Sequence, residues 1–312
     1  MNLRNNMQSI RRCVLTISFF LLSSTVPVLS PAKSVPALAV LSQIKSKVKA
    51  GYSKKMIEGF NGQMLLRRYR VRTEKKGGVT IFFNDGSEVR LFGETELTIG
   101  AKKSRNYRWV RYRLFLHTGS FWGHFVRGKH PVEIGGGGMR LQLSNASLRF
   151  SREKTAIDIA VPSGMAKVSN KSSSVKLLAG QRLYQVRKND FLPQKISLIP
   201  NQLKLWIEPS APFFKGKESL KLNLHFQIVR YGTDLPVDRP GSIYLKSNYY
   251  NLKIPDSIQL NKDGKAKTTI EVAPPRSNDR TFEGSVTLHS TMDQSGYNDV
   301  QDGLLKVRFT SH

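Results

Sequence analysis

The sequence predicts an all-β fold, in which an N-terminal signal peptide precedes two β domains. Short runs rich in Val, Ile, Phe and Tyr alternate apolar and polar residues with a period of two, the pattern of half-buried strands. Pairs of Gly, Asn, Asp and Ser separate these runs, as turns do. Helical spacing of apolar residues is nearly absent beyond the N-terminus. Together these observations favour antiparallel sheets.

The clearest strand pair surrounds an Asp-Gly turn. Residues 79–83 and 88–92 flank residues 84–87, where Asp85-Gly86 supplies the positive φ of a tight hairpin. Further runs of the first domain are 96–99, 109–117, 121–126, 139–143, 146–150, 156–161, 165–168, 175–178 and 182–186. Between them, the four glycines 135–138 predict a flexible connection, because no Gly-Lys-Ser/Thr and no helix follow them.

The N-terminus has the features of a secretory signal. Arginines precede an apolar run over 14–29, and Ala37-Leu38-Ala39 has the small-x-small form that signal peptidase accepts. We therefore expect a signal peptide over 1–39, cleaved after Ala39, and a protein exported to the periplasm or cell surface. An uncleaved anchor is the alternative, although the run is shorter than a span of about 20 residues. The lone cysteine, Cys13, lies before the run, so the mature chain would lack thiol chemistry.

The segment 40–58 is basic. Val40, Leu41, Ile44 and Val48 follow i, i+4 spacing between lysines. A short basic amphipathic helix and a frayed mature terminus both fit this pattern. We expect the frayed terminus, because so few turns do not form a stable helix alone.

Two prolines in "LPQKISLIPNQ" mark a boundary between two domains. We expect the first β domain over 59–192, a linker over 193–202 and a second domain over 203–312. The second domain contains about seven short strand-like runs, a number typical of an immunoglobulin-like sandwich. These runs are 204–208, 220–231, 242–245, 257–260, 267–272, 284–289 and 303–309.

The formal net charge of +28 indicates an anionic partner. Behind a signal peptide the expected partners are an anionic envelope polymer (polysaccharide or lipopolysaccharide) or a membrane surface, and not nucleic acid. A basic solvated surface without a specific ligand is the other interpretation. We expect no enzyme and no cofactor, because the chain lacks a Ser-His-Asp order, paired carboxylates and a cofactor motif. The sequence sets no oligomeric state.

The basic strand "RNYRWVRYR" is the candidate binding site. In a strand, Trp109, Arg111 and Arg113 share one face, whereas Arg108 and Tyr112 share the other. Guanidinium and aromatic groups on a sheet can hold phosphate or carboxylate groups. A solvated face is the alternative.

Metal sites are weaker candidates. His117, His124 and His130 occupy strand positions in a basic setting, so we interpret them as ordinary strand residues. The neighbouring aromatic residues, Phe121, Trp122 and Phe125, are expected in the core. In "MDQSGYNDVQDG" oxygen ligands could hold Ca²⁺, although an Asx-rich turn explains the same residues. The residues of this calcium candidate are Asp293, Asn298, Asp299 and Asp302.

Residues 59–188 resemble the extracytoplasmic FecR-like domain. The matching elements are Gly62, "VRT" at 71–73, "DGSEVRL" at 85–91, "TEL" at 95–97, "LHTG" at 116–119 with Val126, "PVEI" at 131–134 and "LAGQ" at 178–181. The family's "GT-x-F" element is replaced by "SNASLRF". The resemblance implies a β-rich exported domain without catalysis. The short stretch before the apolar run favours the stand-alone exported type. It also implies an alternative function: an accessory of envelope signalling, of the FecR type that regulates iron or stress responses, acting through an envelope protein partner.

Overall fold

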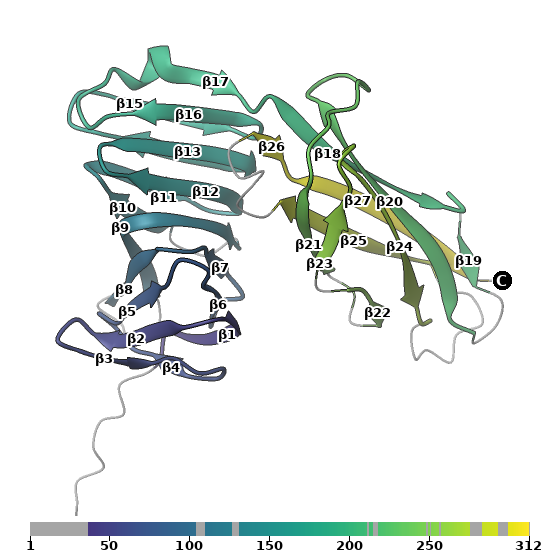
Figure 1. Cartoon of the computed structure of the whole chain (residues 1–312), viewed down its shortest axis with the longest axis horizontal. Coiled ribbons are helices and arrows are strands. Elements are labelled where there is room, and N and C mark those ends of the chain that lie inside the picture. The colour runs from purple at the N-terminus through teal and green to yellow at the C-terminus, as the bar shows by residue number, and fades with distance from the viewer. Residues whose placement is uncertain are drawn as a thin grey trace, which may run out of the picture. The chain divides into compact units, whose positions relative to one another are not determined.

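The computed structural model describes residues 37–103, 110–126, 131–210, 212–214, 218–247, 249, 251–255, 257–274, 283–292 and 299–311. Over these residues the fold is all-β, as the sequence predicts, with one 3-10 turn at Leu192–Lys195. In Figure 1 strands β1 to β17 run from purple to teal, and strands β18 to β27 run from green to yellow. No helix in the described ranges is long and apolar enough to cross a membrane. The predicted signal peptide lies outside them, except for its last three residues.

The first seventeen strands form two sheets over one core. Sheet A has the order β4-β1-β6-β7-β9-β12-β13-β16-β17, and sheet B has the order β3-β2-β5-β8-β9-β10-β11-β14-β15. Apolar side chains from both sheets form a single buried cluster. The strands of sheet A are β1 (Ala39–Lys45), β4 (Met64–Leu65), β6 (Gly78–Phe83), β7 (Glu88–Leu91), β12 (Ala146–Glu153), β13 (Ala156–Ser163), β16 (Gln181–Val186) and β17 (Ile196–Leu198). Those of sheet B are β2 (Val48–Tyr52), β3 (Lys55–Glu58), β5 (Arg70–Thr73), β8 (Glu96–Lys103), β10 (Val132–Gly136), β11 (Met139–Leu143), β14 (Met165–Ser169) and β15 (Ser174–Leu178).

Strand β9 (Val110–Phe125) belongs to both sheets. Its first half pairs with β8 and, in parallel, with β10, whereas its second half pairs with β7 and β12. The sequence predicts two strands separated by a bend; the structure has one strand that changes sheet near Gly119. Gly119 has φ +83°, and a Cβ there would lie 2.4 Å from Thr95 Oγ1. A glycine is needed because the strand bends tightly against Thr95.

The Asp-Gly hairpin is confirmed. β6 and β7 pair from Val79↔Leu91 to Phe82↔Glu88, and Gly86 has φ +86°. The glycine run is more regular than expected: the first two glycines belong to β10, and Gly137 and Gly138, both at positive φ, form the turn into β11. The predicted flexible connection is therefore a hairpin.

The segment 40–58 is neither a helix nor a frayed end, because it forms β1, β2 and β3. Leu41 and Val48 lie in the core, and β1 pairs with β4 and β6. Pairing to formed strands supplies the backbone hydrogen bonds that a short isolated helix would have to make alone. Ala39 is fully buried and pairs with Leu65 and Phe83, while Leu38 is also in the core. Cleavage after Ala39 does not fit this arrangement, because it would remove Leu38 and Ala39 from sheet A.

The remaining strands form a second sandwich around its own buried cluster. All seven predicted runs are strands here. Sheet C contains β22 (Leu252–Lys253), β24 (Lys265–Val272), β20 (Leu220–Arg230), β18 (Asn201–Glu208) and β26 (Val300–Gln301). Sheet D contains β19 (Phe213–Phe214), β27 (Gly303–Ser311), β25 (Glu283–Met292), β21 (Gly241–Ser247) and β23 (Ser257–Leu260). The predicted linker over 193–202 is largely structured, because β17 pairs with β16 and Ile199 is buried.

Candidate functional site

The side chains of the basic strand that the sequence offers as a binding site divide between the core and the outer face of sheet B. Arg111 and Arg113 point outward from β9 and are partly or largely exposed. Tyr112 points inward, is 7% exposed and packs its ring 4.8 Å from that of Phe83. Burial, helped by the charge of Asp85, raises the pKa of Tyr112 to about 12. Tyr112 is therefore a core residue and no part of a binding face. Arg108 and Trp109 lie outside the described residues.

One carboxylate pairs with both described arginines of this strand, Arg111 and Arg113. Arg111 Nη1 lies 2.8 Å from Glu133 Oε1, and Arg113 Nε lies 2.6 Å from Glu133 Oε2. Partial burial raises the pKa of Glu133, but the hydrogen bonds from Arg111 and Arg113 outweigh this effect and hold it below its ordinary value. Glu133 stays ionised and orients both guanidinium groups, so the strand keeps only part of its positive charge.

Further lysines extend the positive charge across the same face. Cross-strand register aligns Arg113 with Glu133, Gln142, Lys167 and Lys176 on β10, β11, β14 and β15. Neighbouring positions add Arg140 on β11 and Lys102 on β8, the latter opposite Arg111. On the described part of β11, β14 and β15, no outward-facing residue is acidic. We call these seven residues the basic face: Lys102, Arg111, Arg113, Glu133, Arg140, Lys167 and Lys176.

The lysine end of the basic face is hollowed. Lys167 and Lys176 lie directly opposite each other, and both line a shallow hollow together with Gln142, Met165 and Ser174. Like charges directly opposite on adjacent strands destabilise a sheet. The arrangement offers two ammonium groups, an amide and a hydroxyl to an anionic group. Sequence reasoning missed these lysines, although both alternate with apolar residues in "AKVSNKSSSVKLL".

The histidines make ordinary strand contacts. His117 Nε2 lies 2.8 Å from Thr98 Oγ1, and His124 Nδ1 lies 3.1 Å from Ser147 Oγ. Burial and the charge of Arg70 lower the pKa of His117. Within the described ranges, no three His, Cys, Asp or Glu side chains converge as metal ligands. His130 lies outside those ranges.

The calcium candidate does not fit the structure. Asp299 lies 3.1 Å from Arg182 Nη1 and 2.8 Å from Arg239 Nη1. Burial raises the pKa of Asp299, but hydrogen bonds from Arg239 and Arg182 outweigh burial and lower it overall. Asp302 pairs with Arg149. Arginine guanidinium groups already pair with the carboxylate oxygens that a Ca²⁺ ion would need as ligands. The other two residues of the calcium candidate, Asp293 and Asn298, lie outside the described residues.

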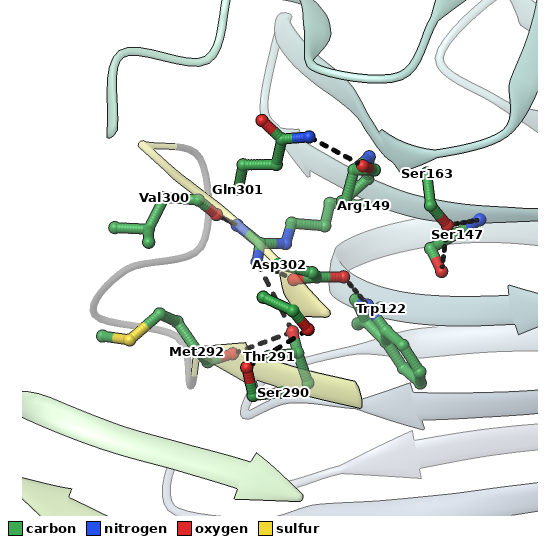
Figure 2. Close-up of polar contacts among 12 residues, drawn as sticks. Trp122, Ser147, Arg149, Ser163, Ser290, Thr291, Met292, Val300, Gln301 and Asp302 are labelled. Carbon is green, nitrogen blue, oxygen red and sulfur yellow. Dashed lines mark hydrogen bonds and ion pairs between the residues drawn. The ribbon is translucent and has the colours of Figure 1, made fainter. Parts of the chain in front are cut away.

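Arg149, which is among the largest fully buried side chains of the described residues, forms a polar cluster (Figure 2). This side chain of β12 is fully buried on the outer face of sheet A. Its Nη1 donates to the Val300 carbonyl at 2.6 Å, and its Nη2 lies 2.5 Å from Asp302 Oδ1. Trp122 Nε1 donates to Asp302 Oδ2 at 3.1 Å. Trp122 is thus buried as expected, but opposite the apolar core that contains Phe121 and Phe125. The cluster joins β9 and β12 to Thr291, Val300 and Asp302.

Comparison with known proteins finds matches among solved structures. No family model matches the chain, and no curated protein matches it. Two crystal structures of a "putative anti-sigma factor" from Parabacteroides distasonis are similar to part of it, at TM-scores of 0.32 and identities of 14% and 13%. Each match covers 39% of this chain and 60% of the other. The chain therefore spans less than two thirds of these structures, and so weak a likeness carries no functional argument.

Proposed function

We propose that this chain is an exported, non-catalytic FecR-like β protein of the bacterial cell envelope, and that its basic face binds an anionic envelope polymer. Polysaccharide, lipopolysaccharide and lipid headgroups share the required chemistry of repeated anionic groups. The observation that supports the proposal best is the direct opposition of Lys167 and Lys176 beside Arg140, on strands whose described outward residues include no acid.

The size of the basic face favours a polymer over a single small anion. Neighbouring strands lie about 4.8 Å apart, so the row from Arg113 on β9 to Lys176 on β15 spans roughly 19 Å. Several anionic groups along one chain would meet this row. Each bound anion would also relieve the repulsion between Lys167 and Lys176, so the bound sheet is expected to be more stable than the free one.

Binding of this kind weakens as salt rises, because surface charges are screened over about 10 Å at 0.1 M ionic strength. The test measures retention of the purified chain on immobilised lipopolysaccharide and on a polyuronic acid as salt increases. Lys167→Ser/Lys176→Ser should weaken retention and flatten its salt dependence. Lys262→Ser/Lys265→Ser is the matched control, because it removes the same charge from an exposed turn and from the exposed first residue of β24 in the second sandwich. Equal retention by both variants would contradict the proposal.

A second function, as an accessory of envelope signalling, is supported by a different surface. β3 and β4 each have one described pairing partner, and exposed apolar residues lie along them. Ile57 is 51% exposed, Phe60 60% and Met64 66%. β3 ends sheet B and β4 ends sheet A, so a partner strand added at either edge would cover part of this apolar surface. Saturable cross-linking to one envelope protein, abolished by Ile57→Ser/Met64→Ser, would support this function; polymer retention would not depend on those residues.

A further inference from the structure

A second hollow, of about 310 Å³, lies against β1, β6, β7 and β21 and shares no residue with the basic face. Four cationic residues line it: Lys45, Lys75, Lys76 and Arg90. None of its described lining residues is acidic. A hollow of this size is at the lower end of the range of small-molecule sites, and its charge selects an anion.

The turn that carries two of these lysines is held firmly. Gly77 N donates to the Glu74 carbonyl at 2.8 Å, and Glu74 N donates to the Lys47 carbonyl at 3.3 Å. Gly93 packs so closely on the turn that a Cβ there would lie 2.2 Å from the Lys75 carbonyl oxygen. These contacts fix the backbone of Lys75 and Lys76 at the rim, so little ordering of the turn is needed when a ligand binds.

Arg90 and Lys45 are held by Tyr244 on the opposite wall. The Arg90 guanidinium lies 4.8 Å from the centre of the Tyr244 ring, and Lys45 Nζ lies 3.3 Å from its hydroxyl. Glu88, which does not line the hollow, pairs with both Arg90 and Lys246. Arg90 Nη1 is buried and makes no hydrogen bond to any described residue. Because the single Glu88 carboxylate is shared between Arg90 and Lys246, it does not neutralise the four cationic residues of the hollow, which therefore stays positive.

The remaining walls suit a sugar. Tyr244 and Phe92 present apolar surface, while Thr80 Oγ1 donates to Gln43 Oε1 at 2.9 Å. That bond occupies the Gln43 acceptor and leaves its amide N–H groups able to donate to a hydroxyl. We propose that this hollow binds a small anionic sugar, with its phosphate or carboxylate between the rim lysines and Arg90 and its ring against Tyr244. This proposal does not rest on the function proposed for the basic face.

Calorimetric titration of the purified chain with glucuronic acid, glucose 1-phosphate and neutral glucose tests the proposal. At least one of the two anions should bind saturably at one site, and the stronger of them identifies the anionic group; glucose should bind much more weakly. Lys75→Ser/Lys76→Ser should weaken anion binding about tenfold. Both side chains are exposed, so the fold should persist.

The matched control is Lys167→Ser/Lys176→Ser, which should leave sugar binding unchanged while weakening polymer retention. Absence of saturable binding by either anion, or equal losses in the two variants, would overturn the proposal. Because the two variants are scored against different ligands, failure of the hollow and failure of the basic face remain distinguishable.

Discussion

Arg149 and Asp302, 153 residues apart in the sequence, form an ion pair with Nη2 and Oδ1 2.5 Å apart. The Arg149 side chain is fully buried and that of Asp302 is 9% exposed. Such a pair is expensive to break from one side, because the remaining charge is left buried without its partner.

We therefore expect Arg149→Met to lower the free energy of unfolding by about 3–5 kcal/mol. Arg149→Met/Asp302→Leu should recover part of this loss, because no charge then remains buried. Chemical denaturation with guanidinium chloride measures the unfolding free energies of the single and the double variant. A single variant within about 1 kcal/mol of the wild type would show that the pair is not buried as described.

Gly119 is expected to tolerate no side chain. Gly119→Ala would place a Cβ 2.4–2.6 Å from Thr95 and Glu94 atoms at φ +83°, so a loss of at least about 3 kcal/mol is expected. Gly62→Ala is the matched control: φ is +85°, but nothing lies within 4 Å. It should cost only about 1–2 kcal/mol. Equal losses in thermal or chemical unfolding would argue against close packing at the β9 bend.

Asp158 should make the protein less stable as pH rises. Burial raises the pKa of Asp158 above 3.8, despite a hydrogen bond from Gln185 N at 2.6 Å. The folded state then binds the proton more tightly than the unfolded state, so stability falls as pH rises from about 3.8 through the folded pKa. Asp158→Asn keeps an acceptor for Gln185 and should be as stable as the wild type at pH 7, or up to about 1 kcal/mol more so.

The unfolding free energies of the wild type and Asp158→Asn, measured from pH 3.5 to 7, isolate the contribution of Asp158. Glu133 and Asp299 titrate in both proteins, so their contributions cancel in the difference. As pH rises, the unfolding free energy of the wild type should fall relative to that of Asp158→Asn. A difference that is constant with pH would contradict the assigned shift.

The mature N-terminus should lie upstream of Ala37. Leu38 and Ala39 are part of the packed sandwich, and Asn84 Nδ2 donates to the Ala37 carbonyl at 2.8 Å. Ser30-Pro31-Ala32 offers another small-x-small site. If the chain is exported as proposed, the intact mass of its mature form should correspond to cleavage after Ala32. A chain that starts at Val40 and unfolds as cooperatively as one starting at Lys33 would contradict the role of β1.

Much of the fold could be predicted from local patterns. The Asp85-Gly86 hairpin and the seven runs of the second sandwich follow from alternation and turn chemistry, which act within a few residues. The β1–β3 segment could not be predicted, since its strands exist only through long-range pairing, such as Ala39 with Phe83. The sequence predicts two strands in place of β9, because Gly119 between two apolar runs is also the sequence signal of a turn.

The candidate site was predicted only in part. Strand alternation predicts that Arg111 and Arg113 share one face, as they do. The sequence could not show that Glu133, on the neighbouring parallel strand β10, would pair with both arginines. Lys167 and Lys176 were missed because single lysines alternating with apolar residues are common on solvated strands. Their opposition depends on register between β14 and β15. The burial of Arg149 depends on residues about 150 positions away.

The most direct test of the central claim is lysine acetylation of the purified chain with and without lipopolysaccharide, read by peptide mass spectrometry. The account predicts that Lys102, Lys167 and Lys176 lose reactivity when the polymer is present, while the exposed Lys54 and Lys262 keep theirs. Uniform protection of all five lysines, or protection that spares Lys167 and Lys176, would contradict binding at the basic face.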